Sequence, residues 1–293
     1  VRPHRELRDA LCDFARQFLA LHERPRQRKR VCVFHNRVSF ILRFPQKRGF
    51  IRRVVRKLLK PVIFRGGVQL PLVHCTPHPR FDRAAEPLVE PIPAAALEEV
   101  TRLLTSADLF RYTAPENAPV SLLEQEFAAM MGVKYALAVS SCSAALFLSL
   151  KALDLPKNAR VLIPAFTFAA VPSSVVHADC VPVLAECGDN YRIDMVDFAA
   201  KLPDVDAVLI SHMRGHTSDM DAIMDLCATA DIPVIEDAAH SLGTTWNGRK
   251  IGTIGRIGCF SFQSYKMINA GEGGILVTDD ADLVARAIIM SGA

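Results

Sequence analysis

The sequence lacks the features that define several protein classes. No stretch approaches the roughly 18–20 uninterrupted apolar residues that a membrane-spanning helix needs. The eight cysteines include no Cys-x-x-Cys pair, so we expect neither a disulfide framework nor a metal site. Glycine, with 15 residues, is too scarce for a fibrous chain. Because the N-terminus also shows no secretory-signal pattern, we predict a cytoplasmic protein with free thiols.

Charge is distributed unevenly along the chain. Residues 1–65 contain 19 lysines and arginines but only four acidic residues, whereas the remainder contains 16 basic and 27 acidic residues. Two such different populations predict two separate parts. We divide the chain into a basic N-terminal extension with a Pro- and His-containing linker, residues 1–84, and an ordered domain, residues 85–293.

The basic extension allows two interpretations. Its positive charge is concentrated in RPRQRKR at 24–30 and in an amphipathic stretch at 51–64. Residues 1–65 could contact nucleic acid or an anionic membrane. Alternatively they form a solvated arm, or a segment outside the working fold. The lack of an aromatic platform or a nucleic-acid motif favours the second interpretation.

The part after residue 85 has the pattern of an α/β domain. Ser121 and Glu124 have capping-box spacing and predict a helix start, and Gly132 predicts the end of that helix. Segments 143–153 and 220–230 are long enough for helices. Seven short β-rich runs occur at 135–139, 160–163, 181–184, 207–210, 233–235, 258–262 and 274–277. The alternation predicts a mostly parallel seven-stranded sheet with helices on both faces and ligands at the carboxyl ends of the strands.

Three strand ends carry residues that a ligand could use. Cys142 and Ser143 follow the first strand at a helix start, where free amides bind phosphate; an ordinary serine N-cap is the alternative. Phe168 follows the second strand, and it either stacks on a planar ring or packs in the core. Asp237 follows the fifth strand, and it either caps a helix or meets a positive ligand atom.

A fourth strand end carries Lys266, between Ser261 and a glycine-rich turn at 271–274. A lone lysine is mostly solvated, but a desolvated lysine can lose its proton and act as a nucleophile. One phosphorylated, ring-shaped, electrophilic cofactor would use all four strand ends. The combination therefore favours the ligand interpretation of each.

Together these segments resemble the DegT/DnrJ/EryC1/StrS sugar aminotransferases, pyridoxal-phosphate (PLP) enzymes of fold type I. Five patterns follow in the family's order between about Pro93 and Ala293: SSCSAAL, PAFTF, HMRGHTSDMDAI, VIEDAAHSLG and SFQSYKMINAGEGG. The resemblance implies that residues 85–293 are the PLP-binding large domain of an aminotransferase. It also implies that the small C-terminal domain is largely missing, as in a truncated reading frame.

The resemblance implies a role for each candidate residue. Lys266 would hold PLP covalently as a Schiff base and then move the proton during the reaction. Asp237 would pair with the pyridinium nitrogen, Phe168 would stack on the ring, and His240 would lie beside the ring and its phenolic oxygen. The phosphate would be held by Cys142, Ser143 and Ser261.

The implied reaction moves an amino group from an amino acid, usually glutamate, to a keto sugar that is usually nucleotide-linked, in polysaccharide or glycoside biosynthesis. A homodimer is expected. Cys142 stands where glycine is usual, and Gln263 replaces a histidine. The glutamine variant also occurs in relatives that act on cyclitols and aminobenzoate precursors, so a cyclitol ketone is an alternative acceptor. A second hypothesis is a catalytically inactive binding or regulatory protein whose basic arm contacts nucleic acid or membrane.

Overall fold

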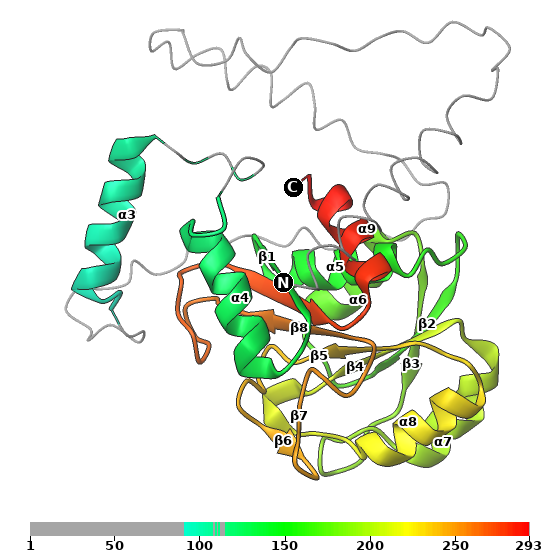
Figure 1. Cartoon of the computed structure of the whole chain (residues 1–293). Coiled ribbons are helices and arrows are strands. Elements are labelled where there is room, and N and C mark those ends of the chain that lie inside the picture. The colour runs from blue at the N-terminus through cyan, green and yellow to red at the C-terminus, as the bar shows by residue number, and fades with distance from the viewer. Residues whose placement is uncertain (1–90, 108, 110, 112–114, 293) are drawn as a thin grey trace, which may run out of the picture. The chain divides into compact units, whose positions relative to one another are not determined.

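A computed structural model describes residues 91–107, 109, 111 and 115–292 of the chain (Figure 1). The predicted basic extension and linker, residues 1–84, lie outside the described residues, and so does the predicted contact of residues 1–65 with nucleic acid or membrane. Within the described ranges, no helix has the length and apolar character required to cross a membrane.

Seven strands form a single sheet in the order β1-β9-β8-β5-β4-β2-β3. Strand β9 is antiparallel to both neighbours, β1 and β8, and the other neighbouring pairs are parallel. The prediction of a mostly parallel seven-stranded sheet is confirmed. The strands are β1 (Tyr135–Val139), β2 (Arg160–Pro164), β3 (Val181–Ala185), β4 (Ala207–Ser211), β5 (Val234–Asp237), β8 (Ile257–Ser261) and β9 (Gly274–Thr278). A separate short hairpin is formed by β6 (Thr245–Trp246) and β7 (Arg249–Lys250).

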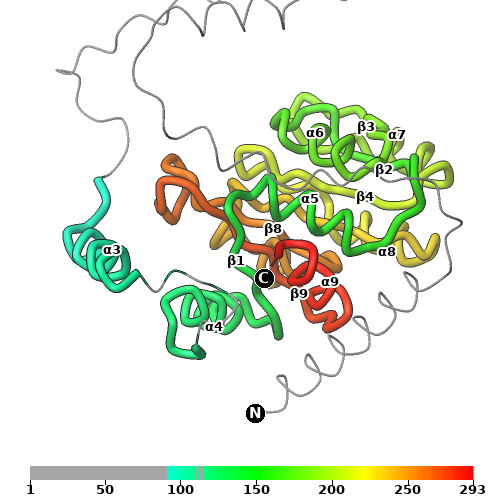
Figure 2. The backbone as a smooth tube through the Cα atoms, turned by 90° about the horizontal axis from the view of Figure 1, so that it is seen from above, coloured from blue at the N-terminus to red at the C-terminus, as the bar shows by residue number. Residues whose placement is uncertain are grey.

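Helices cover both faces of this sheet, as predicted (Figures 1 and 2). One apolar core lies between the sheet and helices α5 (Cys142–Ala152), α6 (Ala170–His177) and α9 (Ala281–Ser291). The core of the other face receives side chains from α4 (Pro119–Met131), α7 (Met195–Lys201) and α8 (Met220–Thr229). Two short 3-10 helices, η2 (Leu202–Asp204) and η3 (Met213–Gly215), lie in connections, and α3 (Ala94–Ser106) has no buried residue.

Local sequence explains where three helices begin and where α4 ends. The side chains of Asp194, Asp219 and Asp280 accept hydrogen bonds from the first amides of α7, α8 and α9, which have no partner within a helix. Gly132 ends α4 in a left-handed conformation with φ 78°, which confirms the predicted stop.

The predicted capping box of α4 is wrong. The helix begins at Pro119, two residues before Ser121, and its N-cap residue makes no side-chain hydrogen bond. Proline suits this position because the first helical amides need no partner within the helix. Glu124 instead turns toward the sheet. It accepts a 2.8 Å hydrogen bond from the amide of Ala138 and pairs with Arg111 at 2.5 Å.

Strand β5 is longer than its apolar run suggested. The prediction ended at Ile235, but pairing with β4 continues through Glu236 and Asp237. Two carboxylates can lie in a buried strand here because each accepts hydrogen bonds from other parts of the chain. Asp237 is therefore the last residue of the strand and does not begin the loop that follows.

Candidate functional site

The predicted site residues converge on one edge of the sheet. The strands that carry them end at this edge, and β9, being antiparallel, begins there. Val139 at the end of β1 and Ser261 at the end of β8 both pair with Gly274 at the start of β9. Across the sheet, Asp237 pairs in register with Ser211 of β4. The ends of β1, β4, β5 and β8 thus present their loops on the same side, which we call the carboxyl edge.

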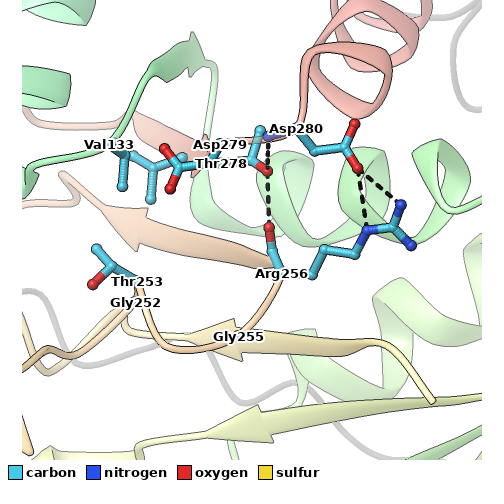
Figure 3. A pocket seen from close by; sticks show the side chains of 9 residues that line it. Val133, Gly252, Thr253, Gly255, Arg256, Thr278, Asp279 and Asp280 are labelled. Carbon is cyan, nitrogen blue, oxygen red and sulfur yellow. Dashed lines mark hydrogen bonds and ion pairs between the residues drawn. The ribbon is translucent and has the colours of Figure 1, made fainter. Parts of the chain in front are cut away.

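A pocket of about 340 Å³ lies at the opposite end of these strands (Figure 3). It is lined by residues that precede β8 and follow β9, including Arg256 and Asp280, whose side chains form an ion pair at 2.8 Å. None of the predicted site residues lines it. Since the predicted site residues all lie elsewhere, we place the candidate site at the carboxyl edge.

Asp237 holds a buried carboxylate at the centre of the carboxyl edge. It is only 6% exposed. Its Oδ2 accepts a 2.8 Å hydrogen bond from the Ser211 hydroxyl, and its Oδ1 accepts one of 3.1 Å from the amide of Ala239. The thiol of Cys142 lies 3.8 Å from Oδ1. The Asp237 carboxylate is therefore fixed in orientation, and no helix follows for it to cap.

Lys266 meets His240 beside this carboxylate. The Nζ atom of Lys266 lies 2.6 Å from the Nε2 atom of His240. Burial lowers the pKa of Lys266, and the negative charge of Asp237 opposes part of that shift. Burial, and then the positive charge of Lys266, lowers the pKa of His240. A neutral imidazole can accept a hydrogen bond from the amine and orient it, and burial is the cause that favours the uncharged form of the lysine.

The loop that carries Lys266 is fixed at its neck. The amides of Phe262 and Ser264 donate to the carbonyl oxygens of Gly273 and Gly271, which extends the antiparallel pairing of β8 and β9. Gln263 holds the turn itself. Its carbonyl accepts from the amide of Lys266, and its side-chain oxygen accepts from that of Tyr265.

The start of α5 offers free amides at the same edge. Ser141 is the N-cap and accepts a 3.1 Å hydrogen bond from Ala144, so the ordinary cap interpretation is correct for this serine. The amides of Cys142 and Ser143 make no hydrogen bond with any described residue. They remain available to an anion, and the helix dipole favours one there.

Gly274 allows β9 to reach the start of α5. A Cβ atom at this position would lie 2.4 Å from the backbone nitrogen of Cys142, closer than any real contact. Only glycine fits. The glycine-rich turn therefore brings the Lys266 loop against the helix start that carries the free amides.

The remaining predicted residues differ in exposure. Phe168, just before α6, is 61% exposed and is therefore not a core residue. Ser261 is partly buried, and its hydroxyl oxygen accepts from the amide of Gln263 at 3.4 Å. The thiol of Cys142 is enclosed, and burial, followed by the charge of Asp237, raises its pKa well above the usual value. This thiol stays protonated at neutral pH.

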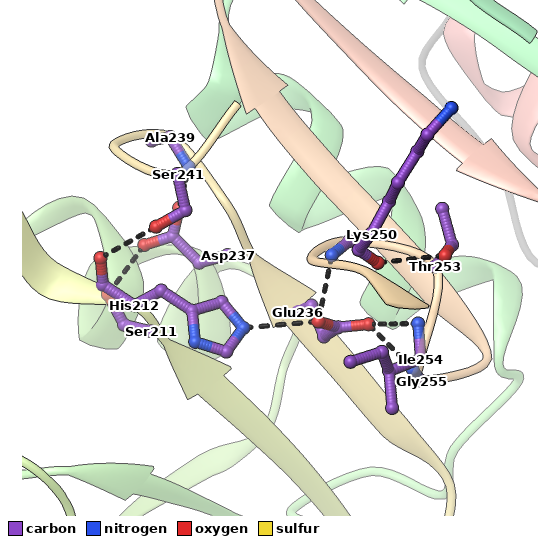
Figure 4. Close-up of polar contacts among 11 residues, drawn as sticks. Ser211, His212, Glu236, Asp237, Ala239, Ser241, Lys250, Thr253, Ile254 and Gly255 are labelled. Carbon is purple, nitrogen blue, oxygen red and sulfur yellow. Dashed lines mark hydrogen bonds and ion pairs between the residues drawn. The ribbon is translucent and has the colours of Figure 1, made fainter. Parts of the chain in front are cut away.

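A second polar cluster lies under the site and was missed by the sequence analysis (Figure 4). The carboxylate of Glu236 is fully buried and accepts from the Nε2 atom of His212 at 3.1 Å. It also accepts from the backbone amides of Gly252, Ile254 and Gly255, at 2.6–2.8 Å. Glu236 thereby fixes the turn that precedes β8.

Sequence reasoning also missed Ser211 and Gln263 as contributors to the site. Ser211 contacts Asp237 only because β4 and β5 pair in parallel with these two residues in register. Gln263 was noted as a departure from the family pattern, but its hydrogen bonds to the Lys266 turn were not foreseen. No group of three His, Cys, Asp or Glu side chains suited to a metal ion occurs in the described part of the chain.

Comparison with known proteins gives consistent matches over this domain. The profile of the DegT/DnrJ/EryC1/StrS aminotransferase family matches residues 94–292. The spore coat polysaccharide biosynthesis protein SpsC of Bacillus subtilis is 39% identical over 197 residues, which are 67% of this chain and 49% of SpsC. A putative L-glutamine:3-amino-2,3-dideoxy-scyllo-inosose aminotransferase of Micromonospora echinospora is 34% identical, over 68% of this chain and 49% of the relative.

A solved structure agrees with the fold. An aminotransferase from Psychrobacter cryohalolentis superposes with a TM-score of 0.63 and 33% identity, covering 68% of this chain and 50% of that protein. The chain thus spans about half the length of the relatives it matches.

Proposed function

The chain belongs to the DegT/DnrJ/EryC1/StrS aminotransferase family, and on this premise we propose that it forms the cofactor-binding part of an enzyme that moves an amino group from an amino acid to a keto acceptor. The family depends on PLP. The observation that carries the proposal is the pairing of Lys266 and His240 at 2.6 Å next to the buried carboxylate of Asp237. An amine whose pKa is lowered by burial, near a fixed carboxylate, suits a cofactor that combines an aldehyde with a basic ring nitrogen.

The described side chains fit each part of PLP. The amine of Lys266 would bind the aldehyde, and the carboxylate of Asp237 would accept a hydrogen bond from the protonated ring nitrogen. The free amides of α5 would hold the phosphate, as helix starts do elsewhere. These amides belong to Cys142 and Ser143. The Ser261 hydroxyl accepts from Gln263 and would donate its own proton to the same phosphate.

Two aromatic side chains would contact the PLP ring, one on its face and one at its edge. Phe168 is exposed at this edge and would stack on the ring, and His240 would contact the phenolic oxygen while it orients the amine. When bound, PLP supplies an electron sink for the charge that develops on the substrate carbon. Lys266, with its lowered pKa, would accept and donate the proton at that carbon.

We propose that the acceptor is a nucleotide-linked keto sugar and that the donor is glutamate. The similarity to SpsC supports a role in polysaccharide assembly. The similarity to the scyllo-inosose aminotransferase supports the alternative of a cyclitol ketone, and L-glutamine, the donor in that relative's name, is an alternative to glutamate. Substrate trials with these two donors against both classes of ketone distinguish the four combinations.

We also propose a homodimer. Large apolar side chains are exposed next to the site: Phe168 at 61%, Tyr265 at 67% and Met267 at 80%. Large exposed apolar side chains are typical of surfaces that bind another protein chain. Sedimentation analysis with and without PLP tests this part of the proposal, and a monomer under both conditions would contradict it.

The central test is the visible absorbance that arises when PLP is linked to a lysine. We expect it in the chain after addition of PLP, and its complete loss in Lys266→Ala. Lys157→Ala is the matched control, because Lys157 is exposed and makes no ion pair with a described residue. Unchanged absorbance in Lys266→Ala would contradict the assignment of Lys266, and no absorbance in the unaltered chain would contradict the proposed function of this chain.

A further inference from the structure

The turn after β4 carries an arginine that the proposed cofactor site does not use. Arg214 is exposed and forms no ion pair with any described residue, whereas Arg102, Arg111, Arg249 and Arg256 each pair with a carboxylate. Its backbone is left-handed, with φ 54° and ψ 24°. Residues other than glycine adopt this conformation at a cost in free energy. Strain of this kind tends to occur at functional sites.

This turn is fixed against the segment that carries Asp237 and His240. The amide of His212 donates to the carbonyl of Asp237 at 3.0 Å, and the Ser241 hydroxyl donates to the carbonyl of His212 at 3.3 Å. A Cβ atom at Gly215 would lie 3.8 Å from the carbonyl oxygen of His240. The turn that carries Arg214 therefore lies against the backbone of His240, and the charge of Arg214 contributes to lowering the pKa of His240.

Three aromatic side chains lie on the loops that follow β2, β3 and β4, and one of them, His216, ends the same turn that carries Arg214. The ring centroids of Phe166 and Tyr191 are 4.9 Å apart, and those of Tyr191 and His216 are 5.4 Å apart. We call these three residues the aromatic row. The Ser218 hydroxyl oxygen accepts from the amide of Ile193 at 3.0 Å, which ties the two loops together. Tyr191 remains 53% exposed.

We propose that Arg214 binds a phosphate of the acceptor substrate and that the aromatic row contacts the nucleoside attached to that phosphate. This inference rests on the proposed function, and it assigns the nucleotide part of the acceptor to residues of this chain. A guanidinium forms paired hydrogen bonds with phosphate oxygens, and an exposed aromatic ring stacks on a base or a sugar. A donor such as glutamate carries carboxylates that Arg214 could bind, but it has no ring for the aromatic row.

Binding of inorganic pyrophosphate to the PLP-loaded chain tests the role of Arg214 by calorimetry. We compare Arg214→Asn, in which asparagine tolerates the left-handed backbone, with Arg214→Lys, which keeps the charge. Loss of a charge-assisted pair predicts a dissociation constant about 10- to 100-fold higher for Arg214→Asn, with a smaller loss for Arg214→Lys. Arg192→Asn is the matched control, because Arg192 is exposed and lies next to Tyr191. An equal loss in this control would overturn the assignment to Arg214.

Two further titrations separate the possible ligands. Tyr191→Leu should weaken guanosine diphosphate and leave pyrophosphate unchanged; an equal effect on both would refute the aromatic row. If Arg214→Asn weakens L-glutamate but not pyrophosphate, the arginine serves the donor and the proposal is wrong. Visible absorbance is recorded for every variant. Its absence from the unaltered chain counts against the proposed function, whereas normal absorbance with pyrophosphate binding independent of Arg214 counts only against this inference.

Discussion

Glu236 and Asp237 are consecutive residues of one strand, yet their surroundings differ in kind. Glu236 is fully buried and accepts four hydrogen bonds, three from the backbone of one turn and one from His212. A carboxylate has about four acceptor positions, so Glu236 has none to spare. Asp237 accepts from one hydroxyl and one amide and contacts one thiol, a weak donor. The Asp237 carboxylate can therefore accept a further hydrogen bond, and it lies near the amine of Lys266.

This difference indicates that Glu236 stabilises the fold, whereas Asp237 is available to bind a ligand. A saturated, buried carboxylate fixes the parts of the chain that donate to it, and replacing it disturbs the fold. A carboxylate with spare capacity next to a partly exposed lysine can still bind a ligand. Because side chains alternate along a strand, β5 offers one carboxylate to each face. One strand thus supplies both the scaffold and the candidate site.

The largest expected effect is on turnover in Asp237→Asn. Removing a preorganised charge partner typically lowers kcat by about 100- to 1000-fold. The free energy of unfolding should change by no more than about 1 kcal/mol, the usual size of a single hydrogen-bond effect. The spectral change on addition of glutamate, together with urea unfolding, measures both quantities. Normal turnover in this variant would remove Asp237 from the site.

Glu236→Gln should have the opposite effect, with a large loss of stability as its main consequence. The amide group of glutamine brings a donor toward three backbone amides that need acceptors, and breaking such a buried cluster costs about 3–5 kcal/mol of unfolding free energy. Urea unfolding of Glu236→Gln and Asp237→Asn, side by side, tests the contrast. If both variants lose the same free energy of unfolding, the assignment of a structural role to Glu236 and a ligand-binding role to Asp237 is wrong.

The pH dependence of PLP attachment should follow Lys266. Burial lowers the pKa of this lysine below the ordinary 10.5, and only the neutral amine attacks an aldehyde. The attachment rate should therefore rise with pH and level off below pH 10.5. Between the two pKa values the folded chain binds fewer protons than the unfolded chain, so stability should also rise with pH in that window. Stopped-flow absorbance across pH gives the midpoint, and one at or above 10.5 would show that the amine is not desolvated.

The smallest expected effect concerns Cys142, whose thiol contacts the carboxylate with spare capacity. Its pKa is raised well above the usual value by burial and by the charge of Asp237, so little thiolate forms at neutral pH. Iodoacetamide should therefore modify Cys142 slowly, and peptide mass spectrometry reports the rate. Asp237→Asn removes one cause of the raised pKa and should speed the alkylation of Cys142. Rapid modification of Cys142 in the unaltered chain would show that the thiol is not enclosed.

The sequence was sufficient for features that depend on neighbours along the chain. All seven strands were predicted to within two residues because apolar runs bounded by turn residues are a local signal, and the end of α4 followed from Gly132. Lys266 and Asp237 were found because each follows such a run. The structure brings both to the same edge as predicted, and their roles remain predictions.

What the sequence could not show depends on pairing between distant segments. Ser211 reaches Asp237 through the register of two parallel strands, and Glu236 finds its donors in a turn that follows in the chain. The capping box failed for the same reason. Glu124 has suitable spacing for Ser121, but a backbone amide of β1 and Arg111 are stronger partners and exist only once the sheet has formed.

The neck of the Lys266 loop has one further consequence. Hydrogen bonds at Phe262 and Ser264 continue the strand pairing almost to the lysine. The backbone of Lys266 is therefore fixed by the two paired segments that carry it. Movement of the amine between one bonding partner and the next then needs only rotation about its own carbon chain. Such rotations take on the order of picoseconds to nanoseconds in exposed side chains, far less than loop rearrangement. The flexible side chain moves the amine, and the fixed backbone keeps it directed at the site.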